Sequence, residues 1–260
     1  MIRDFISKFF LFFLISLVPF LPACSFRQLE VGDWRDTELD IFWPEPPSQQ
    51  RIRLLRVVSG GADLQGGERN KGIFSWLLGQ QVDELPLVSP YGVAADGEGR
   101  IWVADPGSGT VQLYDLKRRK IEYIEQTDKM KLKTPVGVAY DKKQEIIYIS
   151  DSSRREVFLF SLSGNYIGNL GLPGGFGRPA GMAVDKEGCL YVVDVTRGVI
   201  DVFSHNGVFI RSIGSASADN GLFSHPSNIA VDHLGRVYVV DSLRFRIEVQ
   251  DIDGKLIALI

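Results

Sequence analysis

Short apolar runs of two kinds alternate from residue 86 to the C-terminus, and the pair recurs about every 45 residues. The first run is small and apolar and ends on aspartate, as in Met182-Ala-Val-Asp185. The second run carries β-branched and aromatic residues and also ends on aspartate, as in Leu190-Tyr-Val-Val-Asp194. A third run alternates, as in Val199–Phe203. Such runs, bounded by Gly and Asp turns, predict short β-strands rather than helices.

The repeating unit has room for four antiparallel strands. A turn such as Asp185-Lys-Glu-Gly188 joins the first two strands, and a hairpin with Gly207 joins the third strand to an outer one, Val208–Ile213. Units of this size that bury their faces against their neighbours are typical of a β-propeller. The fold class is therefore all-β. The small first run is expected at the hub, where neighbouring blades leave little space.

The copies open on a shared motif, and this motif resembles the NHL-repeat family of β-propellers. The openings are Pro90-Tyr-Gly-Val-Ala-Ala-Asp96, Pro135-Val-Gly-Val-Ala-Tyr-Asp141, Pro179-Ala-Gly-Met-Ala-Val-Asp185 and Pro226-Ser-Asn-Ile-Ala-Val-Asp232. The resemblance covers residues 86–260 and implies four-stranded blades, commonly six to a ring. We find about four complete copies, so we expect an incomplete six-bladed ring, with a complete smaller ring or a ring shared between two chains as alternatives. Asn228 stands where the motif expects glycine.

The N-terminus has the layout of a secretory signal. Arg3 and Lys8 precede a mainly apolar run over 9–20, which Leu21-Pro-Ala-Cys24 ends. This ending resembles the bacterial lipobox, which implies cleavage after residue 23, acylation of Cys24 and attachment to a membrane. Ser25, rather than aspartate, favours the outer over the inner membrane of the cell envelope. An uncleaved anchor helix and an ordinary cleaved signal are the alternatives.

Two segments separate this signal from the repeats. Residues 24–50 are acidic and contain Pro44, Pro46 and Pro47, which predicts a stiffened tether. Residues 51–85 are expected to hold a strand over 51–58 and a short helix or loop that covers the first blade. The net charge of −3 gives no support for nucleic-acid binding, which export would also oppose.

The sequence offers little for metal or cofactor chemistry, and we predict none. His205 and His233 are expected on one face of the propeller and His225 on the opposite face, which does not form a zinc triad. The repeated aspartates precede turns, so we interpret them as caps of backbone amides rather than as calcium ligands. No Gly-x-Ser-x-Gly or His-Glu-x-x-His motif occurs.

One cluster suggests a binding surface. The loops before each first strand and the turns after each second strand should emerge on one face. Together they carry a basic rim, consisting of Tyr91, Arg154, Arg155, Arg178, Arg197, Arg244 and Arg246. The functional interpretation is a docking face for a protein or an acidic ligand, and the alternative is a solvated loop set whose arginines pair with neighbouring aspartates.

These observations favour an exported, lipid-anchored propeller that acts as a non-catalytic interaction scaffold. The alternative is a metal-dependent hydrolase or lyase of the lactonase-like or amidating-lyase-like type. The first strands offer mainly Val, Ala, Met and Ile to the hub, with Tyr140 the main polar exception, and this is why we prefer a scaffold.

Overall fold

The structure, a computed structural model, describes residues 41–45, 47–55, 57–58, 64, 85–124, 126–127, 130–214 and 223–260. The predicted signal segment, 1–23, and Cys24 lie outside these residues. Within them, no helix is long and apolar enough to cross a membrane.

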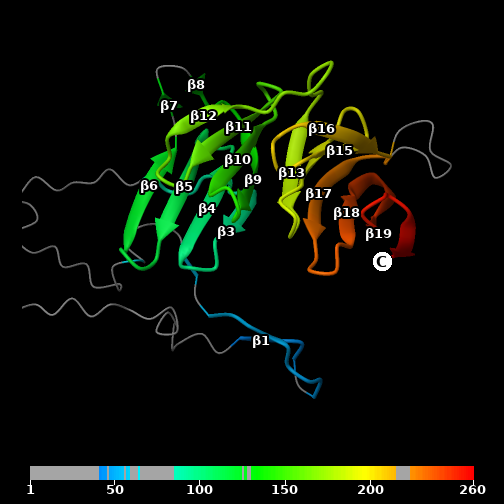
Figure 1. Cartoon of the computed structure of the whole chain (residues 1–260). Coiled ribbons are helices and arrows are strands. Elements are labelled where there is room, and N and C mark those ends of the chain that lie inside the picture. The colour runs from blue at the N-terminus through cyan, green and yellow to red at the C-terminus, as the bar shows by residue number, and fades with distance from the viewer. Residues whose placement is uncertain are drawn as a thin grey trace, which may run out of the picture.

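Among the described residues, four four-stranded antiparallel sheets form the body of the protein, and each is one blade of a β-propeller. Within each blade the strands follow one another in chain order, from an inner strand to an outer one. Figure 1 shows the inner strands towards the centre of the propeller. They are β3 (Gly92–Ala95), β9 (Pro135–Asp141), β13 (Pro179–Val184) and β17 (Pro226–Val231). The predicted all-β fold of about four propeller blades is therefore confirmed.

The strand bounds follow the predicted runs closely. Blade 1 consists of β3 (Gly92–Ala95), β4 (Arg100–Asp105), β5 (Thr110–Asp115) and β6 (Lys120–Ile124). Blade 2 consists of β9 (Pro135–Asp141), β10 (Ile146–Asp151), β11 (Glu156–Ser161) and β12 (Tyr166–Asn169). Blade 3 consists of β13 (Pro179–Val184), β14 (Leu190–Asp194), β15 (Val199–Phe203) and β16 (Phe209–Ile213). Blade 4 consists of β17 (Pro226–Val231), β18 (Val237–Asp241), β19 (Arg246–Gln250) and β20 (Leu256–Leu259).

Smaller elements lie outside the blades. Two short pairs are β1 (Phe42–Trp43) with β2 (Ile52–Arg53) and β7 (Gln126–Thr127) with β8 (Met130–Lys131). A 3-10 turn, η3 (Ser242–Arg244), follows β18. The β1–β2 pair joins the end of the expected tether to the start of the expected N-terminal strand, and Trp43 is 71% exposed there.

Apolar side chains hold neighbouring blades together. One cluster lies between blades 1 and 2 and includes Trp102 and Phe160, and a second lies between blades 2 and 3 and includes Phe203. A third cluster joins Val193 of blade 3 to Val239 of blade 4. Because strand side chains alternate between the two faces of a sheet, each blade can bury both faces only if it has two neighbours.

The glycine of the Pro-x-Gly motif allows adjacent inner strands to approach each other. A Cβ atom on Gly137 would lie 2.2 Å from the carbonyl oxygen of Ala180 in the next blade, and one on Gly92 would lie 2.4 Å from that of Val136. Side-chain atoms cannot come so close, so these positions require glycine. Asn228, the equivalent residue of blade 4, is exposed. The departure from the motif therefore occurs at the one inner strand that no described blade follows.

The outer faces of the first and last blades differ in how they are covered. On blade 1, Tyr114 is buried against Leu64, which comes from the segment before the repeats. On blade 4, strand pairing places Ala230 and Tyr238 on the face away from blade 3, where Ala230 is exposed and Tyr238 is partly exposed. In the described part of the chain, no hydrophobic cluster joins blade 4 to blade 1.

The aspartate that ends each second strand ties the loops of its blade together. These strand-end aspartates, fully buried, are Asp105, Asp151, Asp194 and Asp241. Asp151 accepts hydrogen bonds from the amides of Lys133 and Thr134, at 2.6 and 3.0 Å, which precede the inner strand. It also accepts from the amides of Ser153 and Arg154 in the turn after its own strand. The interpretation of these residues as backbone caps is confirmed. Some of the capped amides lie 17 or 18 residues away in the sequence, which is further than a local turn extends.

The first-strand aspartates of blades 3 and 4 cap their own hairpins. Asp185 accepts from the amides of Glu187 and Cys189, both at 2.8 Å. Asp232 does the same with Leu234 and Arg236. These are the local turn caps that the sequence suggests.

Replacement of Asp105 tests the role of the strand-end aspartates. Burial acts to raise the pKa of Asp105, but hydrogen bonds from the amides of Val88, Ser89 and Ser108 outweigh it, and the net pKa is lowered. We expect Asp105→Asn to reduce the free energy of unfolding by about 2–4 kcal/mol at neutral pH, because the amide side chain leaves buried donors without acceptors.

The pH dependence has a definite sign. A carboxyl group with a lowered pKa contributes stability above its unfolded value of 3.8, and this stability is lost as the pH falls through the lowered folded value. The difference between wild type and Asp105→Asn, measured by urea unfolding, should therefore shrink below about pH 4. Asp253→Asn, at an exposed hairpin position, is the matched control and should change stability little. Equal effects of the two substitutions would contradict this role.

Candidate binding site

Three positions of every described repeat lie around the strand-end aspartate, at one end of the propeller axis. These are the residue before the motif proline, the residue after it, and the residue after the strand-end aspartate itself. In blade 3 they are Arg178, Ala180 and Val195. The amide of Arg178 donates to Asp194 at 3.0 Å, and the amide of Val195 donates to the carbonyl oxygen of Arg178, also at 3.0 Å. Blades 2 and 4 make the equivalent bonds, so the same backbone geometry presents different side chains in these blades.

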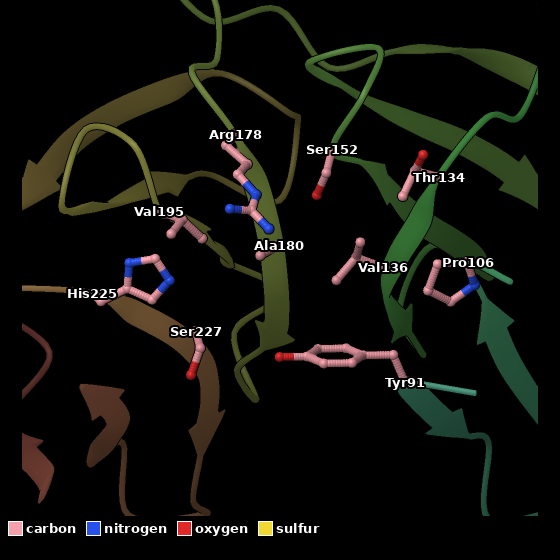
Figure 2. A pocket seen from close by; sticks show the side chains of 10 residues that line it. All are labelled: Tyr91, Pro106, Thr134, Val136, Ser152, Arg178, Ala180, Val195, His225 and Ser227. Carbon is pink, nitrogen blue, oxygen red and sulfur yellow. The ribbon is translucent and has the colours of Figure 1, made fainter. Parts of the chain in front are cut away.

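These positions line a cavity of about 260 Å³, which we call the axial pocket. Its lining residues are Tyr91, Pro106, Thr134, Val136, Ser152, Arg178, Ala180, Val195, His225 and Ser227 (Figure 2). Every one of them occupies one of the three repeat positions, and all four blades contribute. The pocket is therefore a product of the repeat itself rather than of an inserted loop.

The chemistry of the axial pocket differs from one side to the other. Figure 2 shows Arg178 and His225 on one side and Tyr91 reaching in from the other, with Val136 and Pro106 nearby. His225 is half-buried, Arg178 is exposed, and Tyr91 is 56% exposed. The pocket thus combines a basic wall with an apolar and aromatic wall.

Two of the pocket hydroxyls are already engaged. Ser152 Oγ donates to the carbonyl oxygen of Pro179 at 2.7 Å, and Thr134 Oγ1 lies 2.7 Å from Ser153 Oγ. These bonds hold the loops of blades 2 and 3 in place. In the part of the chain that the structure describes, the hydroxyls of Tyr91 and Ser227 make no such bond, so they can bind a ligand.

The predicted basic rim divides into paired and unpaired arginines. Arg197 Nη1 donates to Asp201 Oδ2 at 2.6 Å and lies 3.6 Å from Asp194 Oδ2. Asp201 is fully buried, and burial is the main cause of its raised pKa, while Ser212 and Arg197 act in the opposite direction. Arg197 thus neutralises buried carboxylates within blade 3.

Two rim arginines of blade 4 are also paired. Arg244 Nη1 lies 3.6 Å from both Asp241 Oδ2 and Glu248 Oε1. Arg246 Nε donates to the same Glu248 Oε1 at 3.1 Å. Both guanidinium groups are therefore used within their own blade.

The three remaining rim arginines come from blades 2 and 3. Arg154 Nε lies 3.6 Å from Glu156 Oε2. Among described residues, no acidic side chain forms an ion pair with Arg155 or Arg178. Of the predicted rim, only Tyr91 and Arg178 line the axial pocket.

A second cavity, of about 190 Å³, continues from the axial pocket along the inner strands. Gly92, Gly137 and Gly181 contribute to its lining, together with Tyr91 and Val136, which both cavities share. The hub is therefore formed largely by the edges of the inner strands.

The expectation that Tyr140 is a polar group of the hub is wrong. Its ring stacks on Trp102 with a centroid distance of 5.7 Å, within the cluster between blades 1 and 2. Side chains of an inner strand point towards the neighbouring blades, because the hydrogen-bonding edge of the strand faces the axis. Polar side chains reach the axis from the loops.

The sequence interpretation also missed His225. It considered the three histidines only as zinc ligands, whereas His225 is half-buried in the axial pocket. His205 is exposed in the hairpin between β15 and β16, and His233 is exposed in the hairpin between β17 and β18. The missed signal was positional: His225 precedes its motif proline, as Arg178 does. Within the described residues, no group of three or more His, Cys, Asp or Glu side chains could hold a metal ion.

Comparison with known sequences points to propeller-type proteins. Residues 125–226 match the family described as the SMP-30/gluconolactonase/LRE-like region. The chain is 22% identical over 208 residues to NHL repeat-containing protein 2 of Gallus gallus, a match that covers 64% of this chain and 28% of the relative.

Solved structures share the fold. The streptogramin B lyase structure aligns with a TM-score of 0.54 at 17% identity, over 66% of this chain and 55% of the lyase. A catalytically inactive variant of virginiamycin B lyase from Staphylococcus aureus, with quinupristin, aligns with a TM-score of 0.52 at 14% identity, over 65% of this chain and 54% of the lyase. The chain thus spans about half the length of these lyases. The comparisons support a relationship to gluconolactonase-like and NHL-type propellers.

Proposed function

We propose that this protein is an interaction scaffold of the bacterial cell envelope that binds its partner at the axial pocket. One observation carries the proposal: a constant backbone, fixed by the strand-end aspartates, brings varied side chains from four blades to one cavity. A concave site with a few convergent polar groups on a rigid support is the usual form of a binding site.

Site-specific photo-crosslinking in cells tests this proposal. A photoreactive amino acid at Ser227, in the axial pocket, should give crosslinks to a discrete partner. The matched control is the same amino acid at Asp253, in the hairpin between β19 and β20 at the opposite end of the blade. Equal crosslinking at both positions, or none at Ser227, would argue against a partner at this pocket.

We further propose that acylated Cys24 anchors the protein to a membrane, with the outer membrane favoured over the inner. The support is the apolar run over 9–20, closed by Leu21-Pro-Ala-Cys24, and the serine that stands after the cysteine in place of aspartate. Multiple acyl chains attach a soluble domain firmly, since each buried methylene contributes about 0.8 kcal/mol.

Labelling with a palmitate analogue tests the anchor. The wild-type chain should incorporate the label and remain with the membrane fraction, and Cys24→Ala should lose the label and leave the membrane. Cys189→Ala, which changes a half-buried cysteine of blade 3, is the control and should behave as wild type. Equal labelling of Cys24→Ala and wild type would refute acylation at this residue.

A second candidate function is that of a propeller lyase or hydrolase, metal-dependent or not. One observation favours it: His225, a residue type suited to acid–base catalysis, lies half-buried in the axial pocket of a chain that has the fold of two lyases. Incubation of the full chain with quinupristin, followed by mass spectrometry, is the direct assay. Turnover that is lost in His225→Ala and kept in His233→Ala would support this function, and no turnover would leave the scaffold as the better interpretation.

A further inference from the structure

The axial pocket holds a positive charge that the described part of the protein does not neutralise. Four rim arginines lie within ion-pair distance of a carboxylate, namely Arg154, Arg197, Arg244 and Arg246. Arg178 has no such partner among the residues of the structure, and Figure 2 shows its guanidinium directed into the pocket. Among the rim arginines that the structure describes, it alone combines an unpaired charge with a place in the cavity.

The backbone of Arg178 is fixed on both sides. Its amide donates to Asp194, and its carbonyl oxygen accepts from Val195. The Asp194 carboxylate is fully buried and accepts further amide hydrogen bonds from Gly177 and Arg197. The nearest repeated aspartate is thus used by the loop and by Arg197, which leaves the guanidinium of Arg178 for a ligand. A side chain held in this way binds with little loss of backbone entropy.

The other lining residues indicate which chemical group accompanies the negative charge in the ligand. Val136, Ala180 and Val195 are apolar, and Tyr91 presents an aromatic ring from blade 1. His225 adds a hydrogen-bond donor on the basic side, since a neutral imidazole always carries one N–H. A volume of about 260 Å³ accommodates a group the size of one large side chain. A charged end and an apolar body of this size are joined in a C-terminal apolar residue.

We propose that the axial pocket binds the C-terminal carboxylate of a partner protein whose last residue is apolar, with Arg178 as the ligand of the carboxylate. Arg178 pairs with the carboxylate, helped by His225 and the hydroxyls of Tyr91 and Ser227. The apolar side chain packs against Val136 and Tyr91. This inference rests on the proposed binding function and names the chemistry of the partner.

Matched peptides test the proposal on the full chain in detergent by calorimetric titration. The probe is acetyl-Ala-Ala-Phe with a free carboxylate, compared with the same peptide as its amide. We expect the acid to bind about tenfold to a hundredfold more tightly than the amide, the range of one charge-assisted hydrogen bond. Equal affinity of acid and amide, or no binding of the acid at millimolar concentration, would overturn the proposal.

Protein variants assign the effect to Arg178. In Arg178→Ala the preference for the acid over the amide should disappear, and Arg178→Lys should keep part of it, because an ammonium retains the charge without the bidentate geometry. The control is Arg155→Asn, which removes an exposed arginine outside the pocket and should keep the full preference. Asparagine suits this position because Arg155 has a φ of 58°.

The Arg155→Asn control also shows which result would contradict the assignment to Arg178. A loss of preference in Arg155→Asn equal to that in Arg178→Ala would show a general charge effect and refute the assignment. Circular dichroism of each variant confirms that the blades are intact.

A third probe separates the two sources of an apolar carboxylate. Phenylpropionate, a free small acid, should bind more weakly than the peptide acid, and equal affinity would refute a peptide C-terminus as the natural ligand. The test is distinct from that of the proposed function: crosslinking at Ser227 without a preference for the acid would refute this inference and keep the scaffold. A preference for the acid without crosslinking would refute the cellular partner and keep the site's chemistry.

Discussion

The buried carboxylate at the end of each second strand is the interaction on which the rest of this structure depends. In every blade it accepts hydrogen bonds from two successive amides just before the inner strand. A buried charge is tolerated only where donors surround it, and a buried amide only where it finds an acceptor. The two requirements satisfy each other here, so the loop path is the same in each repeat whatever side chains it carries.

Because the backbone path is constant, the side chains that line the axial pocket can differ from blade to blade. The position before the motif proline holds Thr134, Arg178 and His225 in successive blades, and all three line the pocket. Their backbone amides meet the strand-end aspartates, so the loop path does not depend on which side chains they carry. The fold supplies geometry, and these positions supply specificity. A relationship to other propellers therefore says little about the ligand, because the ligand depends on the residues that the fold leaves free.

Inner-strand packing explains both a rule of the motif and its exception. Gly92, Gly137 and Gly181 lie where a Cβ atom would meet the next inner strand, and Asn228 lies where no described strand follows. The substitution in the fourth copy could be seen in the sequence, but its meaning could not. Only the arrangement of the blades shows that this position is exposed. Tyr140 is a position where the sequence misled. Its place on an inner strand suggested a side chain at the hub, whereas its ring stacks on Trp102.

The sequence alone predicted the four blades that the described residues form, the order of their strands and the hairpin caps, because these follow from a repeat of about 45 residues, from short apolar runs and from turns only a few residues long. It also placed Tyr91 and Arg178 on one face of the propeller, and both residues line the axial pocket. It could not separate Arg178 from the paired arginines such as Arg197 and Arg244. Their partners Asp201 and Glu248 stand four residues further along the chain, and whether such residues pair depends on how the turn after the second strand directs the side chains. It could not find His225 either. Those distinctions belong to the tertiary structure, because which charges are neutralised and which side chains meet at the axis depends on how loops from four blades converge in space.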